Sequence, residues 1–414
     1  MTLFFLLAGL AAYGCYGLKG LIFLLLLTAG SFLAARAIPK HRWAFWACLL
    51  FGALWLGMVK LQPITGISLL APLGISYFIL RILSYLVDIY RGKYPPTADF
   101  SRYALYVTWF PAIFLGPIER FDRFEPPKAA FSWENFSTGA VRILWGLFKK
   151  LTIAARAGVI VGAISAAPDK YRGAYALFAM VLYSLQLYAD FSGGVDIVLG
   201  ASRILGVGLC ENFDTPYCSQ SIAEFWRRWH MSLGSFLRDY VYIPLGGSRK
   251  GKLRKVLNTI LTFLVSGLWH GVHYLLWGVL NGLLVCCGEK LKTPVKLVNQ
   301  ILTFLLISLL WSFFIWPDTG AALHMLGSLT TLNYGSLFRN LLNLGLNLGE
   351  WVVLVMSTCI LWVCDLHLPR LQQAYAGLTP AKRTALCCAL GLTVLIFGMY
   401  GLGFEAGDFI YSRF

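Results

Sequence analysis

Long stretches without any charged side chain are the feature that most constrains this chain. They cover residues 43–59, 61–80, 173–189, 257–288, 297–317 and 384–404. A helix needs about 20 apolar residues to cross the hydrocarbon core of a bilayer. The run 257–288 is therefore long enough for more than one crossing, or for one crossing and a re-entrant piece. These runs predict a protein that crosses the membrane several times.

The composition supports an all-α fold within the bilayer. Hydrophobic residues make up 58% of the chain and charged residues 13%, about half the share usual in a soluble domain. The runs lack the alternation of a barrel, and helices satisfy their own backbone in lipid. With weaker segments near 2–17, 21–36, 100–118, 140–165, 321–332 and 346–368, we expect roughly 10–12 transmembrane helices plus interfacial or re-entrant helices.

We expect residues 1–414 to form a single membrane-embedded domain, because no hydrophilic stretch is long enough for a separate soluble one. The first 36 residues resemble a signal peptide in their apolar character. However, Lys19 interrupts the apolar run and no basic segment precedes it, so two retained membrane helices are predicted there.

The chain carries a formal net charge of +16. Its basic residues gather in what the sequence suggests are short loops: Arg36, Lys40 and Arg42; Arg91, Lys93 and Arg102; Lys149 and Lys150; Arg249, Lys250, Lys252, Arg254 and Lys255; Lys290, Lys292 and Lys296. The positive-inside rule explains such clusters as cytoplasmic orientation signals. They would also help to hold anionic lipid or a negatively charged donor. Nucleic-acid binding is excluded, because it needs a basic face on a folded soluble module.

Two acidic residues, Asp190 and Asp196, lie within otherwise apolar helix on either side of Ser192-Gly193-Gly194. Acids at membrane depth are costly, so they face protein or water and are functional candidates. The alternative is a polar clamp that fixes helix packing. The glycine pair allows either a break in the helix or close approach of a neighbour.

Residues 221–240 have the spacing of one amphipathic helix, placed in the interface plane or in a cytoplasmic funnel. Apolar side chains from Phe225 to Tyr240 recur every three or four residues, and Glu224 is positioned to pair with Arg228. His230 lies on this segment. Taken alone, it is more easily read as an interfacial hydrogen-bonding residue than as a catalyst.

His270 is different, because it lies in the middle of the long run 257–288, between Gly267 and Gly271. Burial disfavours the imidazolium, so an apolar setting keeps the basic nitrogen free. This suits a general base that removes a proton from a hydroxyl group during acyl transfer. His273 follows three residues later, but two histidines without nearby Cys, Asp or Glu make a poor metal site, and none is predicted.

These segments together resemble the membrane-bound O-acyltransferase family. The resemblance is carried by ENFDTPYCSQSIAEFWRRWHMSLGSFLRDYVYIPLGG (211–247) and SGLWHG (266–271), with PLGISYF, FPAIFLGPIERF and YADFSGGVDIVLG before them. It extends from about residue 65 to the C-terminus. The closest branch holds the alginate O-acetylation membrane protein and the D-alanyl-lipoteichoic acid transfer protein. Within this branch, the intact PLGGSR motif and the WRRWH motif favour the members that O-acetylate polysaccharides.

The resemblance implies specific roles. His270 corresponds to the family's essential histidine and His230 to its second histidine. The fold would be a ring of membrane helices around a central tunnel that starts at a cytoplasmic thioester donor, either acyl-CoA or an acyl carrier protein, with no tightly bound cofactor. Residues of the matched motifs become candidates for donor binding or for supporting the site: Asp190, Asp196, Asn212, Trp226, Arg227, Arg228, Arg238, Trp269 and Arg249.

The chain ends in FIYSRF, which places Phe409, Tyr411 and Phe414 in a Phe-x-Tyr-x-x-Phe pattern within residues 405–414. One interpretation of this pattern is an aromatic anchor at the membrane interface. The pattern also resembles the C-terminal motif of this branch, in which the tyrosine hydroxyl carries the acyl group on the outer face. A tethered phenol has a high effective concentration, and a tyrosyl ester passes its acyl group on more readily than a sugar ester, because the phenol that leaves has a pKa near 10. We favour the relay, with the C-terminus on the extracytoplasmic side.

The sequence therefore predicts an integral-membrane O-acyltransferase of the cytoplasmic (inner) membrane. It would move an acyl group, most simply acetyl, from a cytoplasmic donor to a cell-surface or exported polysaccharide through an extracytoplasmic partner enzyme. Three alternatives stay open: D-alanyl transfer to teichoic acid, acylation of a lipid or protein, and a transporter or flippase of a polymer precursor. The concentration of polar residues in one third of the chain disfavours the transporter, whose polar groups usually occupy two related halves.

Overall fold

The computed structural model describes residues 1–67, 69–127, 130–288, 292–331 and 333–400. Every regular element within these residues is a helix, and the one extended pairing there is an isolated bridge between Phe213 and Trp229. The predicted all-α fold is confirmed. Tyr411 and the rest of the C-terminal pattern lie outside the described residues.

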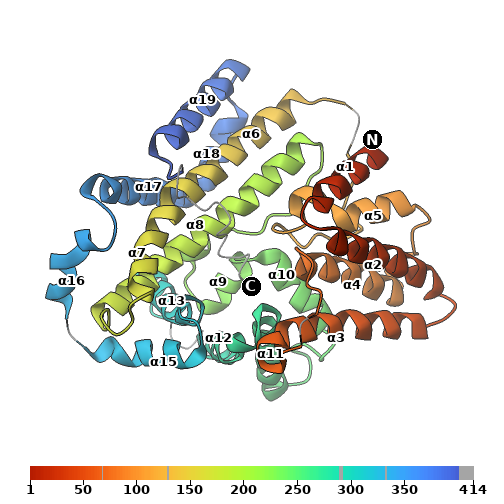
Figure 1. Cartoon of the computed structure of the whole chain (residues 1–414), viewed down its shortest axis with the longest axis horizontal. Helices are drawn as coiled ribbons and strands as arrows, with labels where there is room; N and C mark the ends of the chain where they lie inside the picture. The colour runs from red at the N-terminus through yellow and green to blue at the C-terminus, as the bar shows by residue number, and fades with distance from the viewer. Residues whose placement is uncertain (68, 128–129, 289–291, 332, 401–414) are drawn as a thin grey trace.

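The two ends of the described chain lie on opposite sides of a central helix pair (Figure 1). One side holds α1 (Thr2–Gly14), α2 (Leu18–Ala37), α3 (Trp43–Thr65), α4 (Ile75–Tyr90) and α5 (Phe100–Thr108). The other holds α17 (Leu348–Leu366), α18 (Leu368–Ala376) and α19 (Pro380–Phe397). Between them α6 (Trp133–Phe148) runs along α8 (Ala174–Ile204) and continues through a π-helical turn, Lys149–Ala154, into α7 (Ala155–Ser165).

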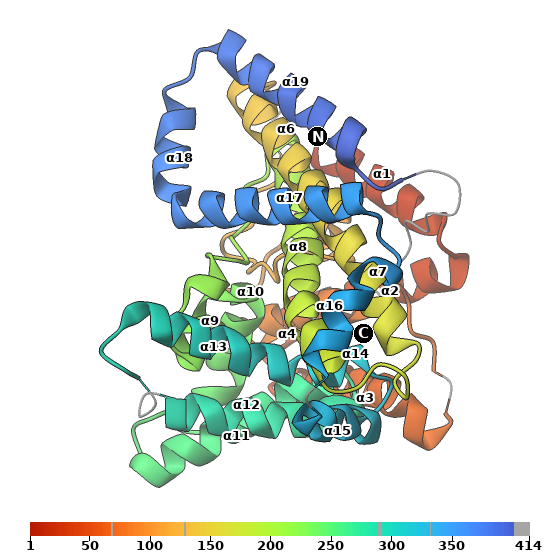
Figure 2. The ribbon, with the colours of Figure 1, turned by 90° about the vertical axis from the view of Figure 1, so that its left-hand side faces the viewer.

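The middle of the molecule contains short helices. In Figure 1, α9 (Ile222–Arg228) and α10 (Met231–Leu237) lie near the centre. Beyond them α11 (Lys252–His270) and α12 (Leu275–Cys287) form a hairpin, seen side by side in Figure 2. The chain then passes through α13 (Lys296–Leu310), α14 (Ser312–Ile315), α15 (Thr319–Gly327) and α16 (Tyr334–Asn340).

Six of the described helices are long and apolar enough to cross a membrane: α2, α3, α8, the α13–α14 segment, α17 and α19. The protein is thus a multi-pass membrane protein, although the six are fewer than the 10–12 crossings expected. The difference arises because several predicted crossings fold as shorter elements. Residues 100–118 form the short α5 and an irregular segment, and residues 321–332 lie partly in the short α15. The run 257–288 folds as two packed helices.

The packing of α6 against α8 depends on glycine. A Cβ atom on Gly146 would lie 2.4 Å from the Gly193 carbonyl oxygen, so no side chain fits there. Helix α8 continues without a break through Gly193 and Gly194, and of the two predicted roles the glycines serve close approach. Lys149 and Lys150 were expected in a loop. They lie instead inside the continuous α6–α7 helix and face acids of α8.

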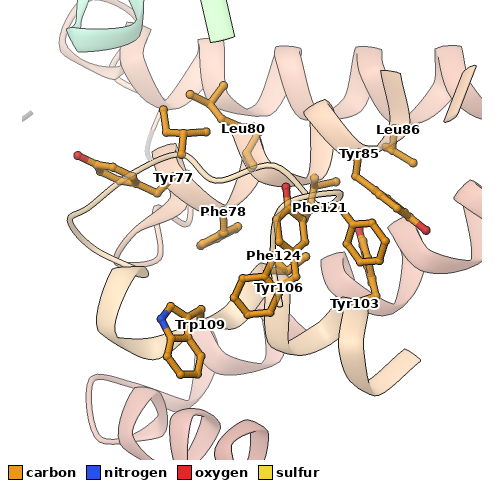
Figure 3. Packing of buried hydrophobic residues seen from close by; sticks show 14 of the residues in the cluster. Tyr77, Phe78, Leu80, Tyr85, Leu86, Tyr103, Tyr106, Trp109, Phe121 and Phe124 are labelled. Carbon is orange, nitrogen blue, oxygen red and sulfur yellow. The ribbon is translucent and has the colours of Figure 1, made fainter. Parts of the chain in front are cut away.

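A cluster of aromatic side chains holds α4, α5 and the irregular segment 109–125 together. Figure 3 shows Tyr85, Tyr103 and Phe121 in mutual contact, and the ring of Tyr85 lies 4.7 Å from each of the other two. The buried Arg81 guanidinium donates to the carbonyls of Ala112 (2.7 Å) and Pro117 (3.3 Å). These bonds satisfy backbone groups that a longer helix would pair internally, so the segment stays folded although its only helical part is the 3-10 turn Phe110–Ala112.

Candidate active site

His270 lies at the tip of the α11–α12 hairpin. Helix α11 ends at His270 because Gly271 adopts φ +146°, a conformation that side chains disfavour. The return is tight: a Cβ atom on Gly267 would lie 2.5 Å from the Tyr274 carbonyl oxygen. The glycines of the SGLWHG motif therefore allow the turn that presents the imidazole at a helix end.

His230 lies at a break between two helices, and the prediction of one continuous amphipathic helix over 221–240 was wrong. The residue has a left-handed backbone, φ +46°, between α9 and α10, and a π-helical turn, Arg238–Tyr242, follows α10. Residues 212–214 pair with residues 228–231 across this break, through Asp214 N–H to Arg228 O (3.0 Å) and Met231 N–H to Asn212 O (2.9 Å). The predicted ion pair of Glu224 with Arg228 forms, at 2.9 Å.

Asn212 fixes the orientation of the His230 ring. Its Oδ1 atom accepts hydrogen bonds from the Ser232 N–H (3.1 Å) and the Ser232 hydroxyl (2.8 Å), and it lies 3.1 Å from His230 Nδ1. Because a backbone N–H donates to this atom, it is an acceptor, so Nδ1 of His230 must carry the proton. The ring nitrogen left with a lone pair is then Nε2. Both side chains are buried.

Trp269 lies between the two histidines. Its ring is in edge contact with His270, at 4.7 Å between ring centroids, and with His230, at 6.2 Å. Phe314 and Trp277 also pack against the His270 ring. Trp226 is held against α12 by a 3.0 Å hydrogen bond from its ring N–H to Asn281 Oδ1. The two imidazoles thus face an apolar, aromatic environment.

A cavity of about 340 Å³ connects the two histidines with exposed arginines. It brings together five of the predicted site residues: His230, His270, Trp226, Arg227 and Arg238. Arg227 and Arg238 are exposed, so the cavity opens to its surroundings beside two guanidinium groups, of which Arg238 is paired with Asp239 at 2.8 Å. Asn212 and Trp269 do not line the cavity, but Asn212 contacts the His230 ring and Trp269 contacts both histidine rings.

The other predicted residues do not line this cavity. Asp190 pairs with Lys150. Asp196 pairs with Lys149 (2.6 Å) and with Arg142 (3.0 Å), as a polar clamp between α6 and α8 would require. Arg228 is held by Glu224. Arg249 is exposed in the turn before α11.

The sequence reasoning missed a row of hydroxyl groups along α11. Thr259, Thr262 and Ser266 line the cavity at helical spacing, and His270 is the next residue in the row. Over these 11 steps the row extends about 16 Å. The spacing i, i+3, i+7, i+11 was visible in the sequence, although the hydroxyls were hidden in a run considered only for its apolar length. Lys60 of α3, also missed, lies within electrostatic range of His270.

The histidines do not form part of a metal cluster in the described part of the chain, where no group of three or more His, Cys, Asp or Glu residues comes together. His273 is exposed, and its carbonyl oxygen accepts a 3.0 Å hydrogen bond from the Thr319 hydroxyl. The site can therefore offer two imidazoles, a row of hydroxyls and two arginines to one elongated ligand. This set can accept a proton, orient a carbonyl group and bind negative charge.

Comparison with known proteins agrees with this chemistry. A sequence model of the membrane-bound O-acyltransferase family matches residues 90–319. The chain is 35% identical to the probable alginate O-acetylase AlgI of Pseudomonas fluorescens, over 83% of this chain and 68% of that protein. It is 33% identical to the peptidoglycan O-acetyltransferase of Helicobacter pylori, over 66% of this chain and 59% of that protein.

A teichoic acid D-alanyltransferase of Streptococcus thermophilus is 30% identical, over 64% of this chain and 68% of that protein. The matched part spans between 50% and 68% of the length of the alginate O-acetylases. The family match includes the break at His230 and the hairpin tip at His270, the two features from which the site is built. The chain belongs to the membrane-bound O-acyltransferase family.

Proposed function

We propose that this membrane-bound O-acyltransferase transfers an acetyl group from a cytoplasmic thioester to a hydroxyl acceptor for the O-acetylation of an exported or cell-surface polysaccharide. The observation that carries the proposal is the single cavity in which His270 and His230 share space with Arg227 and Arg238. The names of the relatives support the polysaccharide, because they refer to alginate and to peptidoglycan.

In the proposed reaction His270 acts as the general base. It takes the proton of the acceptor hydroxyl while that oxygen forms a bond to the thioester carbonyl carbon. The C–S bond then breaks, and the thiol leaves with the proton that His270 returns. His230, with Nδ1 held by Asn212, would direct Nε2 toward the reacting groups as a positioning residue. Arg227 and Arg238 would bind the phosphates of coenzyme A or the acidic surface of a carrier protein.

For the onward step we propose that the acceptor is the Tyr411 hydroxyl. This step rests on the Phe-x-Tyr-x-x-Phe pattern of the sequence. The acyl-tyrosine would present the acetyl group on the extracytoplasmic side, where a partner enzyme would pass it to the polymer. In this scheme the C-terminus is extracytoplasmic, the membrane is the cytoplasmic one and residues 1–414 act as one domain.

The test is transfer of labelled acetyl groups from acetyl-CoA by protein reconstituted in liposomes. His270→Ala should lower transfer by about 10²- to 10⁴-fold, the usual contribution of a general base. His273→Ala is the matched control, since this histidine is exposed three residues away, and it should keep normal transfer. Near-normal transfer by His270→Ala would refute the proposed base.

The relay has its own test. Tyr411→Phe removes one oxygen and keeps the ring, so it should abolish an acetyl ester on the C-terminal peptide and polymer acetylation with it. An anchoring tyrosine would tolerate this change. The ester should be detected by mass spectrometry in the wild-type protein and be labile to mild base. Full polymer acetylation by Tyr411→Phe would eliminate the relay and leave the role of His270 intact.

D-alanyl transfer is the second candidate, since one relative is named a teichoic acid D-alanyltransferase. Acetyl is favoured because the relatives named O-acetylase or O-acetyltransferase are more similar to this chain. Parallel assays with acetyl and D-alanyl thioesters, each on coenzyme A and on a carrier protein, separate the acyl group from the carrier. Faster transfer of D-alanyl would reverse the assignment.

A further inference from the structure

A second cavity, of about 200 Å³, lies between α8, α13 and α17 and shares no lining residue with the histidine cavity. Five aromatic side chains line it: Phe178, Tyr188, Tyr217, Phe304 and Trp362. The other lining side chains are apolar or weakly polar, with the exception of one carboxylate, Asp365 of α17. An acid beside an otherwise apolar cavity in a membrane-spanning helix is expected to have a function.

Asp365 differs from the other two acids buried near α8. Asp190 and Asp196 are ion-paired with lysine or arginine, whereas Asp365 forms no ion pair within the described residues. Its one hydrogen bond there is accepted from the Tyr188 hydroxyl, at 2.7 Å. A neutral donor of this kind leaves the negative charge uncompensated.

The charged groups nearby do not supply the missing cation. Lys149 lies over the Tyr188 ring at 5.9 Å, but its ammonium is engaged by Asp196 at 2.6 Å and by the Ser192 hydroxyl at 2.7 Å. Asp196 is paired in turn with Lys149 and with Arg142, so these nearby charges compensate one another. The Asp365 carboxylate is therefore the charged group that this cavity offers, and it favours a positively charged ligand.

We propose that this cavity binds the ammonium head group of a membrane aminophospholipid. A carboxylate next to aromatic faces is the combination that recognises an ammonium ion, through a charge-assisted hydrogen bond and through cation–π attraction. The occupant is a lipid because the cavity is lined by membrane-spanning helices and by Trp362, whose side chain on α17 is 48% exposed. The apolar lining would cover the adjoining part of its alkyl chains.

The bound lipid would touch the wall of the histidine cavity. The rings of Tyr188 and Tyr217 each pack against Trp229, with 6.1 Å between centroids. Trp229 lines the histidine cavity, next to His230 in the chain. Occupancy of the second cavity should therefore stabilise the wall that separates the two sites.

The experiment measures lipid binding to the purified full chain by native mass spectrometry and by the thermal shift on lipid addition. The probes are phosphatidylethanolamine, phosphatidylglycerol and soluble phosphoethanolamine. Wild-type protein should retain phosphatidylethanolamine in preference to phosphatidylglycerol. Asp365→Asn should weaken that binding by about 10- to 100-fold, the usual effect of losing a charge-assisted hydrogen bond. Soluble phosphoethanolamine should bind far more weakly, because it has no chains.

Three further variants make the result specific. Tyr188→Phe keeps the ring and frees the carboxylate, so it should bind phosphatidylethanolamine at least as well as wild type. Trp362→Leu replaces an exposed side chain and should fold, but it should bind several-fold more weakly. Asp169→Asn removes a charge from a side chain that is 90% exposed and should change nothing. Equal retention of phosphatidylethanolamine by wild type, Asp365→Asn and Trp362→Leu, or a preference for phosphatidylglycerol, would overturn the proposal.

Discussion

Ser266 places a hydroxyl group in the histidine cavity one helical turn before His270. The side chain is 6% exposed and forms no hydrogen bond within the described residues. Because the hydroxyl lines the cavity, water or a bound ligand can be its hydrogen-bond partner, and its removal leaves no buried group unsatisfied. Ser266→Ala is therefore expected to leave the thermal stability unchanged or slightly higher, and to raise the KM for the thioester.

The measurement is a melting curve together with donor kinetics, with Ser266→Thr as the variant that keeps the hydroxyl. If the hydroxyl binds the donor, Ser266→Thr should retain a lower KM than Ser266→Ala. A lower melting temperature for Ser266→Ala with an unchanged KM would instead assign the serine to helix packing.

The two histidines were predictable from the sequence, because short motifs identify them. Their surroundings were predictable only in part. Asn212 was a candidate, but its hydrogen bond to His230 depends on backbone pairing between positions 18 residues apart. Asp190 and Asp196 were recognised as buried acids, whereas their partners Lys149 and Lys150 were assigned to a loop. Each lysine lies in one helix and its acid in another, so the pairs form only when the two helices pack together, and the sequence does not show which helices pack.

At the level of elements, the break at His230 makes a quantitative prediction. A left-handed conformation costs a side chain about 1–2 kcal/mol, and glycine avoids this cost. His230→Gly should therefore be more stable than His230→Ala, by about 1 kcal/mol in the free energy of unfolding, while both lose the imidazole. Denaturant unfolding of the two variants in one detergent measures the difference. Equal stability, or a more stable alanine variant, would mean that α9 and α10 rejoin into one helix.

The clamp between α6 and α8 makes another prediction at this scale. Asp196 is 13% exposed and compensates Lys149, which is 4% exposed. Its neutralisation in Asp196→Asn leaves a buried charge and should cost about 3–5 kcal/mol. Glu211→Gln is the matched control, since Glu211 is 53% exposed and shares Arg142 with Asp196. This change should cost at most about 1 kcal/mol. Similar losses in the melting temperature of both variants would argue against a buried clamp.

The helical nature of the elements followed from the uncharged runs, but their ends did not. Apolar residues at three- and four-residue spacing over 221–240 fit one long helix as well as two short ones in series. The choice is made by residues 212–214, which pair with the chain at the break. Likewise, the length of 257–288 allowed a hairpin, while the close fit of Gly267 against Tyr274 decides where it turns.

On the scale of the whole molecule, the positive charges lie at the N-terminal end of α11, and the cavity follows the rest of the helix. The basic turn at residues 249–255 covers the chain just before this helix and the first turn of the helix itself, and the cavity follows the helix from Thr259 to His270. Arg238 and Tyr242, which come just before the turn, line the same cavity. Since basic loops stay in the cytoplasm, the cavity should open to the cytoplasm, the compartment that supplies thioesters.

Transfer should therefore depend on the side from which the donor is supplied. Acetyl-CoA does not cross a bilayer, so inside-out vesicles, which expose the cytoplasmic face, should incorporate label from added donor. Label incorporated by intact right-side-out vesicles should not exceed the background of His270→Ala, and permeabilising them with detergent should restore incorporation.

A second experiment compares the KM for the donor at low and at high salt concentration. Attraction between exposed arginines and a polyanionic donor weakens as the Debye length falls from about 10 Å at 0.1 M to about 3 Å at 1 M. The KM for acetyl-CoA should rise with salt in the wild-type protein, and it should rise less in the double variant Arg227→Gln, Arg238→Gln. Equal labelling of intact vesicles of both orientations would place the donor entrance on the other face, and the basic turn would then have no part in binding the donor.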